Sequence, residues 1–521
     1  MRGLLGAALL AAGLGVLAGC AGTGASSSAL GPQSASVAAT EFERVKGSPV
    51  ELRMFLQAFP KGGDLHNHLS GAIYAEDFID WGLADGVCFD LESLSAVGPP
   101  CDARSGRPTL AAALSDGLIS RDALIDAWSM RNFVPGHTAA SGHEQFFRSF
   151  FRFDEAGRDG DMLAEAVWHA AEQEVGYLEL MLSPEMGSAR ALARQIGPQP
   201  DFDALYEALL AAGIEELVPR GSARLDRMEA TLADRFGCPQ SAAPACEVEV
   251  RYLAQVIRTF PPEQVYAQSL LAYLLIEADP RIVGLNLVAP EDDHVTLTTY
   301  ETQMRQLGQL AALRGQAPVA LHAGELKLGL VHPRHLRSHM RQAIEVAGAT
   351  RIGHGVSIAH ERDAERLLMQ MAEDRIAVEI NLTSNAQILE VEGAEHPFET
   401  YRAYGVPLTL STDDEGLSRG DLTHEYRRAV ETYDLSYADL VALSRNAVLH
   451  AFVEGESLWA DPVAFTPVEA CAAVPLGGAA TDAACGAFLE GNHKARLQWR
   501  LEARFADFEA DRAALRRARG L

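Results

Sequence analysis

Apolar residues gather in eight short segments between residues 62 and 415, and most of the intervening stretches have helical periodicity. The segments are GGDLHNHL (62–69), GYLELMLSP (176–184), VEVRYLAQ (248–255), IVGLNLVAP (282–290), PVALHAGE (318–325), RIGHGVSI (351–358), IAVEINLTSN (376–385) and VPLTLSTDDE (406–415). Residues 301–315 show the apolar spacing and terminal glycine of an amphipathic helix. Eight alternating strands and helices predict an α/β fold, a (β/α)8 TIM barrel. An open doubly wound sheet is disfavoured, because no glycine-rich phosphate loop follows the first segment.

Two stretches exceed a minimal barrel. Residues 83–142, which contain Cys88 and Cys101, separate the first strand from the next recognisable helix and are predicted to be an insertion. Since it follows a barrel strand, we expect it either to cover a pocket or to serve only as a packing appendage. Beyond residue 416 the chain is predicted to be mostly helical and to wrap the barrel.

Composition narrows the classes of function. The chain has 521 residues and is 48% hydrophobic, enough to bury a large core. Its net charge is 44 − 71 = −27, which would repel nucleic acid and anionic membrane surfaces. We therefore expect no nucleic-acid partner.

The first twenty residues, MRGLLGAALLAAGLGVLAGC, resemble a bacterial lipoprotein signal. The resemblance implies a signal peptide over residues 1–19, a lipid on Cys20 and a flexible tether over 20–39, so residues 40–521 would form the folded domain. The protein would then be exported and held on a bacterial membrane only by its lipid, facing either the periplasm or the cell exterior. An ordinary secretory signal is the alternative.

The other six cysteines fall into neighbouring couples in loop-like stretches. The couples are Cys88 with Cys101, Cys238 with Cys246, and Cys471 with Cys485. Local disulfides in an oxidising compartment fit this spacing, although six cysteines allow 15 pairings and free thiols remain the alternative.

Metal-ligand residue types occur at several strand ends. His66 and His68 are separated by one residue, so on a strand both point to the same face. His322 and Asp413 end two other predicted strands. Three histidines and one carboxylate predict a single zinc site with space left for water.

Two further residues have the chemistry for proton transfer. Glu325 follows His322 after a glycine that permits a tight turn, so it can face the cavity without binding the ion. His354 lies between two glycines at another strand end and could orient or deprotonate a water molecule.

In order along the chain, the motifs DLHNHLSG, LHAGE, RIGHGV and STDD resemble those of the adenosine deaminase family within the amidohydrolase superfamily, over about residues 59 to 452. The resemblance implies zinc on His66, His68, His322 and Asp413. It implies that Glu325 protonates the purine ring and that His354, assisted by Asp413, acts on the attacking water. Adenosine would yield inosine and ammonia.

The resemblance places four residues against the substrate: Asp414, Ser70, Ala289 and Ser384. Some of these depart from the family pattern. Ser70 stands where many members have Asp, Ala289 replaces Gly, and Asn286 replaces Asp in the same motif.

The leading hypothesis is therefore a zinc deaminase of adenosine or a close adenine nucleoside. Alternatives are a related hydrolase acting on another aminated heterocycle or modified nucleoside, and a nucleoside-binding lipoprotein without turnover. The sequence leaves the oligomeric state open.

Overall fold

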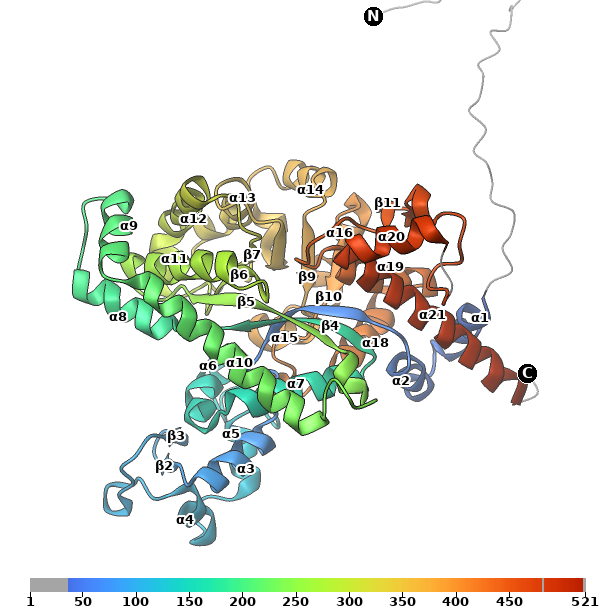
Figure 1. Ribbon diagram of the computed structural model, residues 1–521. Coiled ribbons are helices and arrows are strands. Elements are labelled where there is room, and N and C mark those ends of the chain that lie inside the picture. The colour runs from blue at the N-terminus through green and yellow to red at the C-terminus, as the bar shows by residue number, and fades with distance from the viewer. Residues whose placement is uncertain (1–35, 480–481, 519–521) are drawn as a thin grey trace, which may run out of the picture. The chain divides into compact units, whose positions relative to one another are not determined.

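The computed structural model describes residues 36–479 and 482–518, and its centre is a closed barrel of eight parallel strands (Figure 1). The strands are β1 (Gly62–His68), β4 (Val175–Leu182), β5 (Glu249–Ile257), β6 (Ile282–Val288), β7 (Ala320–Ala323), β8 (Arg351–His354), β9 (Ala377–Ile380) and β10 (Leu408–Leu410). They form two four-stranded sheets, ordered β1-β4-β5-β6 and β10-β9-β8-β7. Parallel bridges from Asn67 to Asp413 and from Leu285 to Val319 join these sheets at both edges. All eight predicted strands and the barrel are thereby confirmed.

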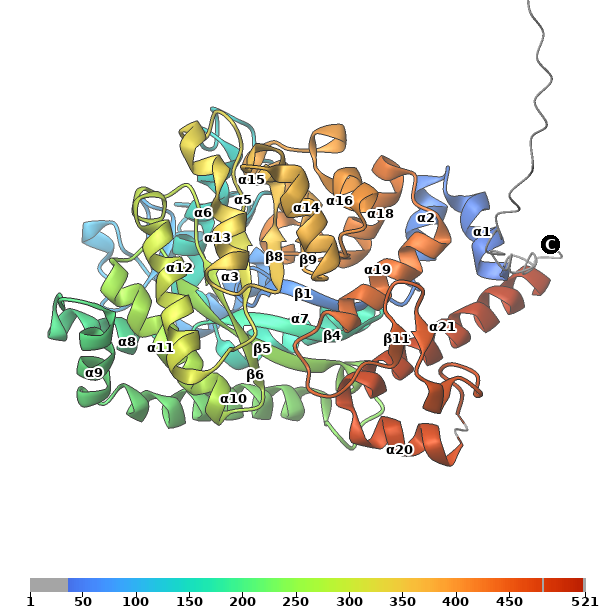
Figure 2. The same ribbon diagram turned by 90° about the horizontal axis from the view of Figure 1, so that it is seen from above.

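Helices surround the barrel and bury the apolar faces of its strands. The main ones are α7 (Asp159–Glu172), α8 (Met186–Ile196), α10 (Leu217–Phe236), α11 (Pro262–Ala278), α12 (His294–Arg314), α13 (His339–Glu345), α14 (Ala364–Glu373), α16 (Phe398–Tyr404), α18 (Leu422–Tyr433) and α19 (Tyr437–Leu449). Figure 2 shows α11, α12 and α13 on one side of the strands. The predicted helix over 301–315 is the second half of α12, which ends at Gly315 with φ 93°.

The connection from β1 to β4 contains the predicted insertion. It comprises α3 (Ala75–Asp85), the hairpin β2 (Cys88–Asp90) and β3 (Ser95–Val97), α4 (Leu110–Ser115), α5 (Arg121–Ala127) and α6 (Gly142–Phe153). Figure 1 shows the hairpin and α4 projecting away from the barrel strands. The regular structure therefore begins slightly before residue 83 and continues into α6 after residue 142.

The two ends of the described chain pack together. Helices α1 (Val37–Val45) and α2 (Pro49–Gln57) lie beside α21 (His493–Ala518). Aromatic rings fill this contact, and Phe55 meets Phe508 edge-on at 5.2 Å between ring centroids. Residues 37–39, which were predicted to belong to the tether, are helical instead, because Ala38 is fully buried here. The segment beyond residue 416 is mostly helical, as predicted, and α21 packs against α1 and α19.

All three predicted cysteine couples form disulfides: Cys88–Cys101, Cys238–Cys246 and Cys471–Cys485. The last stabilises a small outer cluster with α20 (Ala483–Gly491) and the β11 (Trp459–Asp461) and β12 (Thr466–Pro467) pair. Cys20 and the predicted signal peptide lie outside the described residues. Among the described helices, none has the length and apolar character needed to cross a membrane.

Candidate metal and catalytic site

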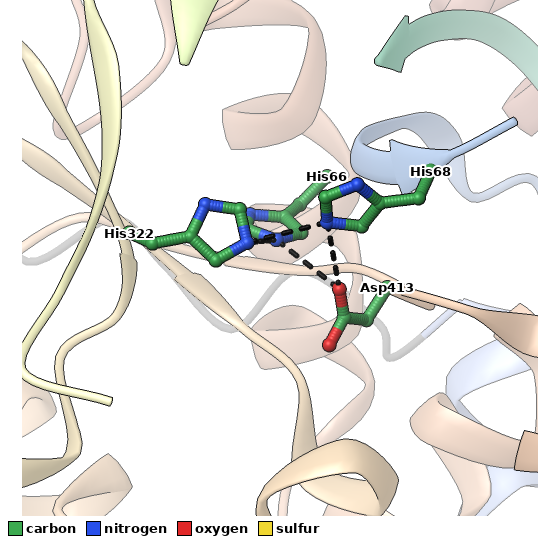
Figure 3. A group of neighbouring side chains, drawn as sticks. All are labelled: His66, His68, His322 and Asp413. Atoms are coloured by element: carbon green, nitrogen blue, oxygen red, sulfur yellow. Dashed lines mark hydrogen bonds and ion pairs between the residues drawn. The ribbon is translucent and has the colours of Figure 1, made fainter. Parts of the chain in front are cut away.

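Side chains from three strand ends converge at the carboxyl end of the barrel (Figure 3). His66 and His68 come from β1, His322 comes from β7, and Asp413 follows β10. Nε2 of His322 lies 3.1 Å from Nε2 of His66 and 3.2 Å from Nε2 of His68. Oδ1 of Asp413 lies 3.3 Å from each of the latter two nitrogens. The structure therefore brings together all four predicted metal ligands.

Oxygen acceptors set the orientation of the three imidazole rings. Nδ1 of His66 lies 2.6 Å from Oε2 of Glu379, and Nδ1 of His68 lies 2.8 Å from Oε1 of Gln255. Nδ1 of His322 lies 2.9 Å from an oxygen of Asn286. Each Nδ1 can therefore donate its hydrogen outward, so in their neutral forms the three rings point Nε2 lone pairs at one centre. Facing lone pairs repel one another unless a cation lies between them, so the donor set fits a divalent metal ion.

Buried charges support the deepest of these ligands. Glu379 is fully buried on β9, and its second oxygen accepts a hydrogen bond from Nε of Arg351 at 2.6 Å. The other arm of Arg351 reaches Glu179 at 2.6 Å. Burial opposes a charge on Glu379, but Arg351 and His66 together hold the pKa of Glu379 below its ordinary value. The carboxylate therefore stays ionised beside His66.

The ligand histidines differ in their electrostatics, because burial, followed by the charge of His66, holds the pKa of His322 well below its ordinary value. Burial lowers the pKa of His66, but hydrogen bonds to Asp413 and Glu379 outweigh it and raise that pKa to about 10. Gly353 lets the His66 ring fit, because a Cβ at residue 353 would lie 2.6 Å from the ring. The glycine before His354 thus makes room on β8 for a metal ligand that comes from β1, a strand with which β8 does not pair.

Glu325 is placed beside the ligands by a buried carboxylate that sequence reasoning missed. Glu291 accepts the backbone N–H of Glu325 at 2.7 Å and that of Gly324 at 3.1 Å. It also lies 2.6 Å from Nδ1 of His339, whose ring stacks on Tyr300. The turn that carries Glu325 is therefore held from its backbone, which leaves the Glu325 side chain free to face the cavity.

Burial favours the protonated form of two carboxyl groups at the site. Burial, followed by the charge of Asp413, raises the pKa of Glu325 well above its ordinary value. The same two causes raise the pKa of Asp414. A Cβ at residue 71 would overlap the Asp414 carboxyl, so Gly71 is needed there. Both neutral carboxyls can donate a hydrogen bond, as proton donors must.

A chain of hydrogen bonds orients His354 and assigns the hydrogen on its ring. The backbone N–H of Phe398 donates to Nδ1 of His396 at 3.2 Å, so the hydrogen of neutral His396 is on Nε2. That nitrogen donates to Oδ1 of Asn385 at 3.1 Å, and Nδ2 of Asn385 donates to Nδ1 of His354 at 2.9 Å. Burial lowers the pKa of His396 to about 4 and that of His354 to about 3. Neutral His354 therefore carries its hydrogen on Nε2, which lies 4.0 Å from Oδ2 of Asp413.

Three residues at the site adopt left-handed backbone conformations. Their φ angles are 78° at Ala289, 68° at His354 and 61° at Asp413. Such angles disfavour residues with a Cβ and often occur where function requires a particular orientation. At Ala289 the angle explains why glycine is the easier residue in this motif.

A cavity of about 510 Å³ opens over the site. His68, His322, Glu325, His354, Asp413 and Asp414 line its depth, and Ser70 and Ala289 line its wall. Among the described residues that line it, Ser384 is absent, and Ser384 is instead buried in α15 (Leu382–Leu389). None of the described lining residues belongs to 83–142, and the lining from this connection consists of Ser70, Asp154 and residues of α6.

The supporting residues left only weak signals in the sequence. Glu379 is one acidic residue inside an apolar strand, and Asn286 was noticed only as a departure from the family pattern. Gln255, Glu291 and Asn385 look like ordinary polar residues at strand ends. Their partners lie far away in the chain, and His66 is 313 residues from Glu379.

Comparison with known proteins identifies the family of this chain. The family model of adenosine deaminase matches residues 158–458. An adenosine deaminase of Shewanella loihica is 43% identical over 115 residues, which is 22% of this chain and 34% of that relative. One from Vibrio parahaemolyticus is 26% identical over 393 residues, covering 75% and 92%. The solved adenine deaminase of Arthrobacter aurescens has a TM-score of 0.49 and 18% identity, covering 76% and 94%. The chain belongs to the adenosine deaminase family and is a hydrolytic deaminase.

Proposed function

We propose that the protein catalyses zinc-dependent deamination of adenosine or a close adenine nucleoside, giving the inosine product and ammonia. The observation that carries this proposal is the meeting of three Nε2 lone pairs and Asp413 beside the neutral acid Glu325. Zinc held by His66, His68, His322 and Asp413 would lower the pKa of a coordinated water to about 7.

The chain's own residues supply the remaining chemistry. Glu325 is neutral and can give its proton to the purine nitrogen next to the carbon that bears the amino group. Nε2–H of His354 can donate to the attacking oxygen and orient it, so we assign His354 an orienting role instead of a basic one. The free oxygen of Asp413 can accept the proton that this oxygen loses.

Asp414 would recognise the purine. Its neutral carboxyl can donate a hydrogen bond to a nitrogen in the five-membered ring, and Gly71 leaves space for it. Water adds at the amino-bearing carbon, ammonia leaves with the transferred protons, and the ring keeps the oxygen. The balance is one water consumed and one ammonia released.

Zinc-loaded protein should convert adenosine to inosine, followed by ultraviolet absorbance, with 2′-deoxyadenosine in parallel. A Glu325→Gln variant with full zinc content is the matched control and should lose about 10²- to 10⁴-fold in kcat. Absence of adenosine and 2′-deoxyadenosine turnover in protein of verified zinc content would contradict the proposal. Turnover at the wild-type rate in Glu325→Gln would contradict the role of Glu325.

We also propose export and lipid attachment at Cys20. Three disulfides in the described part of the chain support an oxidising compartment. Labelling of the full chain with a fatty-acid probe should occur in wild type and disappear in Cys20→Ala. Equal labelling of both proteins would reject Cys20 as the attachment site.

A further inference from the structure

Helix α6 places phenylalanine side chains along the mouth of the active-site cavity. Its sequence is GHEQFFRSFFRF, and the four residues that line the cavity are Phe146, Phe147, Phe150 and Phe151. Phe146 is 1% exposed and anchors the helix, whereas Phe151 is 80% exposed. Exposure of an aromatic ring this large contributes nothing to folding, and at a cavity mouth it is typical of a binding surface.

The helix is held firmly against the barrel. A Cβ at Gly142 would overlap the carbonyl oxygen of Gln387, so α6 and α15 touch backbone to backbone here. Nε2 of His143 lies 2.9 Å from Asp292, on the loop between β6 and α12. The phenylalanines therefore form a fixed wall that is already in place before a ligand enters.

Other apolar residues extend this wall around the mouth. Ile257, Phe260, Val288, Pro290 and Ile388 also line the cavity. Phe260 lies under the guanidinium of Arg190, at 4.4 Å from its ring centroid, but Arg190 is outside the lining. The mouth is therefore apolar on several sides.

Lysine and arginine side chains are missing from the described lining of the cavity. Of the described residues that line it, none is Lys or Arg, whereas Asp154 and Asp293 join the three carboxyl groups of the site. Asp293 is engaged with the backbone N–H groups of Val295 and Thr296 at the start of α12. A phosphate in this cavity would have carboxylates near it and no lining cation to pair with.

The location of the reacting carbon decides which end of the substrate lies against the phenylalanines of α6. The amino-bearing carbon must lie at the ligand cluster, in the depth of the cavity, and the sugar is attached at the far side of the purine. The sugar therefore extends toward the mouth and α6. The 5′ position of the sugar is the part that can extend farthest toward the cavity mouth.

We propose that the phenylalanine wall of α6 binds an uncharged apolar group on the sugar of an adenine nucleoside. The preferred substrates are then 5′-alkylated adenine nucleosides instead of adenine nucleotides. This inference rests on the proposed deaminase function and adds to it the substrate class.

Three substrates that differ only at the 5′ position test it with the zinc-loaded full chain: adenosine, AMP and 5′-butylthio-5′-deoxyadenosine. We expect kcat/KM for the butylthio compound to exceed that for adenosine by about 10-fold or more, since each buried methylene contributes to transition-state binding. AMP should be about 100-fold or more below adenosine. Calorimetric binding of the two products, 5′-butylthio-5′-deoxyinosine and IMP, should show the same preference without turnover.

Phe151→Ala removes the most exposed ring of the wall and should lower the butylthio-to-adenosine ratio several-fold. Met54→Ala is the matched control, because Met54 is 61% exposed on α2 and does not line the cavity, and it should leave the ratio unchanged. If adenosine is turned over but kcat/KM for AMP equals or exceeds that for adenosine, the inference is overturned and the deaminase function stands. The same holds if Phe151→Ala leaves the butylthio-to-adenosine ratio unchanged. Absence of turnover with all three compounds would overturn both.

Discussion

The hydrogen-bond chain behind His354 predicts which nitrogen of that ring carries the hydrogen. In the substitution Asn385→Leu the side chain keeps a similar size but can no longer donate to Nδ1 of His354. Only Nδ2 of Asn381, at 3.4 Å, then remains near that nitrogen. The ring must then rely on this longer hydrogen bond or change its orientation or tautomer, and both weaken the hydrogen bond that Nε2–H gives to the attacking oxygen.

The expected loss follows from this single contact. A buried acceptor without a partner costs about 1–3 kcal/mol, which corresponds to a decrease in kcat of about 5- to 150-fold. KM and zinc content should change little, because the Asn385 side chain bonds to His354 and His396, neither of them a predicted metal ligand, and is not among the described residues of the cavity lining.

The assay is steady-state deamination of adenosine together with ¹⁵N NMR of histidine-labelled protein. Wild type should show one protonated nitrogen on His354, Nε2, and one unprotonated, Nδ1. Asn446→Leu is the matched control, since Asn446 donates to the carbonyl of Leu408, the first residue of β10. It should reduce stability without reducing kcat.

A different result would refute the assignment of the orienting role. If His354 were the base, an aspartate at residue 385 would strengthen it, as a carboxylate does behind a catalytic histidine. A higher kcat in Asn385→Asp, combined with wild-type kcat in Asn385→Leu, would therefore assign His354 as a base. An NMR spectrum with the hydrogen on Nδ1 in wild type would lead to the same conclusion.

Three further predictions concern acid–base chemistry, the metal site and stability. Glu325 is assigned as the acid and its pKa is raised, so kcat should be retained below that pKa and be lost as the pH rises through it. A pH–rate profile in which kcat rises with pH over this range would contradict the assignment. Glu379→Gln should weaken zinc binding about 10- to 100-fold, because His66 loses its carboxylate partner. Competition with a chelator measures this affinity, and an unchanged affinity would show that Glu379 does not support the metal site. Replacing both Cys471 and Cys485 with serine should lower the free energy of unfolding in urea by about 3 kcal/mol, because the disulfide closes a loop between cysteines 14 residues apart. The kcat should not change. Equal stability of the variant would show that the unfolded state is already restricted without the disulfide.

The barrel and the reactive residues could be predicted because both leave local patterns. A strand buried on both faces is a short apolar run, and His66 and His68 show by their spacing alone that they share one face of β1. Because parallel strands in a barrel end at one rim, His322 and Asp413 could be placed beside them without knowledge of any distance. Cysteines that lie close together in the sequence, such as Cys471 and Cys485, were likewise grouped into couples by their spacing along the chain.

Long-range contacts determine the features that sequence reasoning missed. Glu379 supports His66 across 313 residues, and nothing near either residue indicates the partner. Ser384 was placed against the substrate by resemblance alone, and its burial outside the described cavity lining follows from the packing of α15, which decides which of its side chains face inward. The neutral state of Glu325 also depends on burial, because desolvation raises its pKa and water around an exposed residue would not. Sequence patterns therefore determined the fold and the reacting groups of this protein, while tertiary packing decided their charge, their orientation and the apolar mouth through which a substrate must pass.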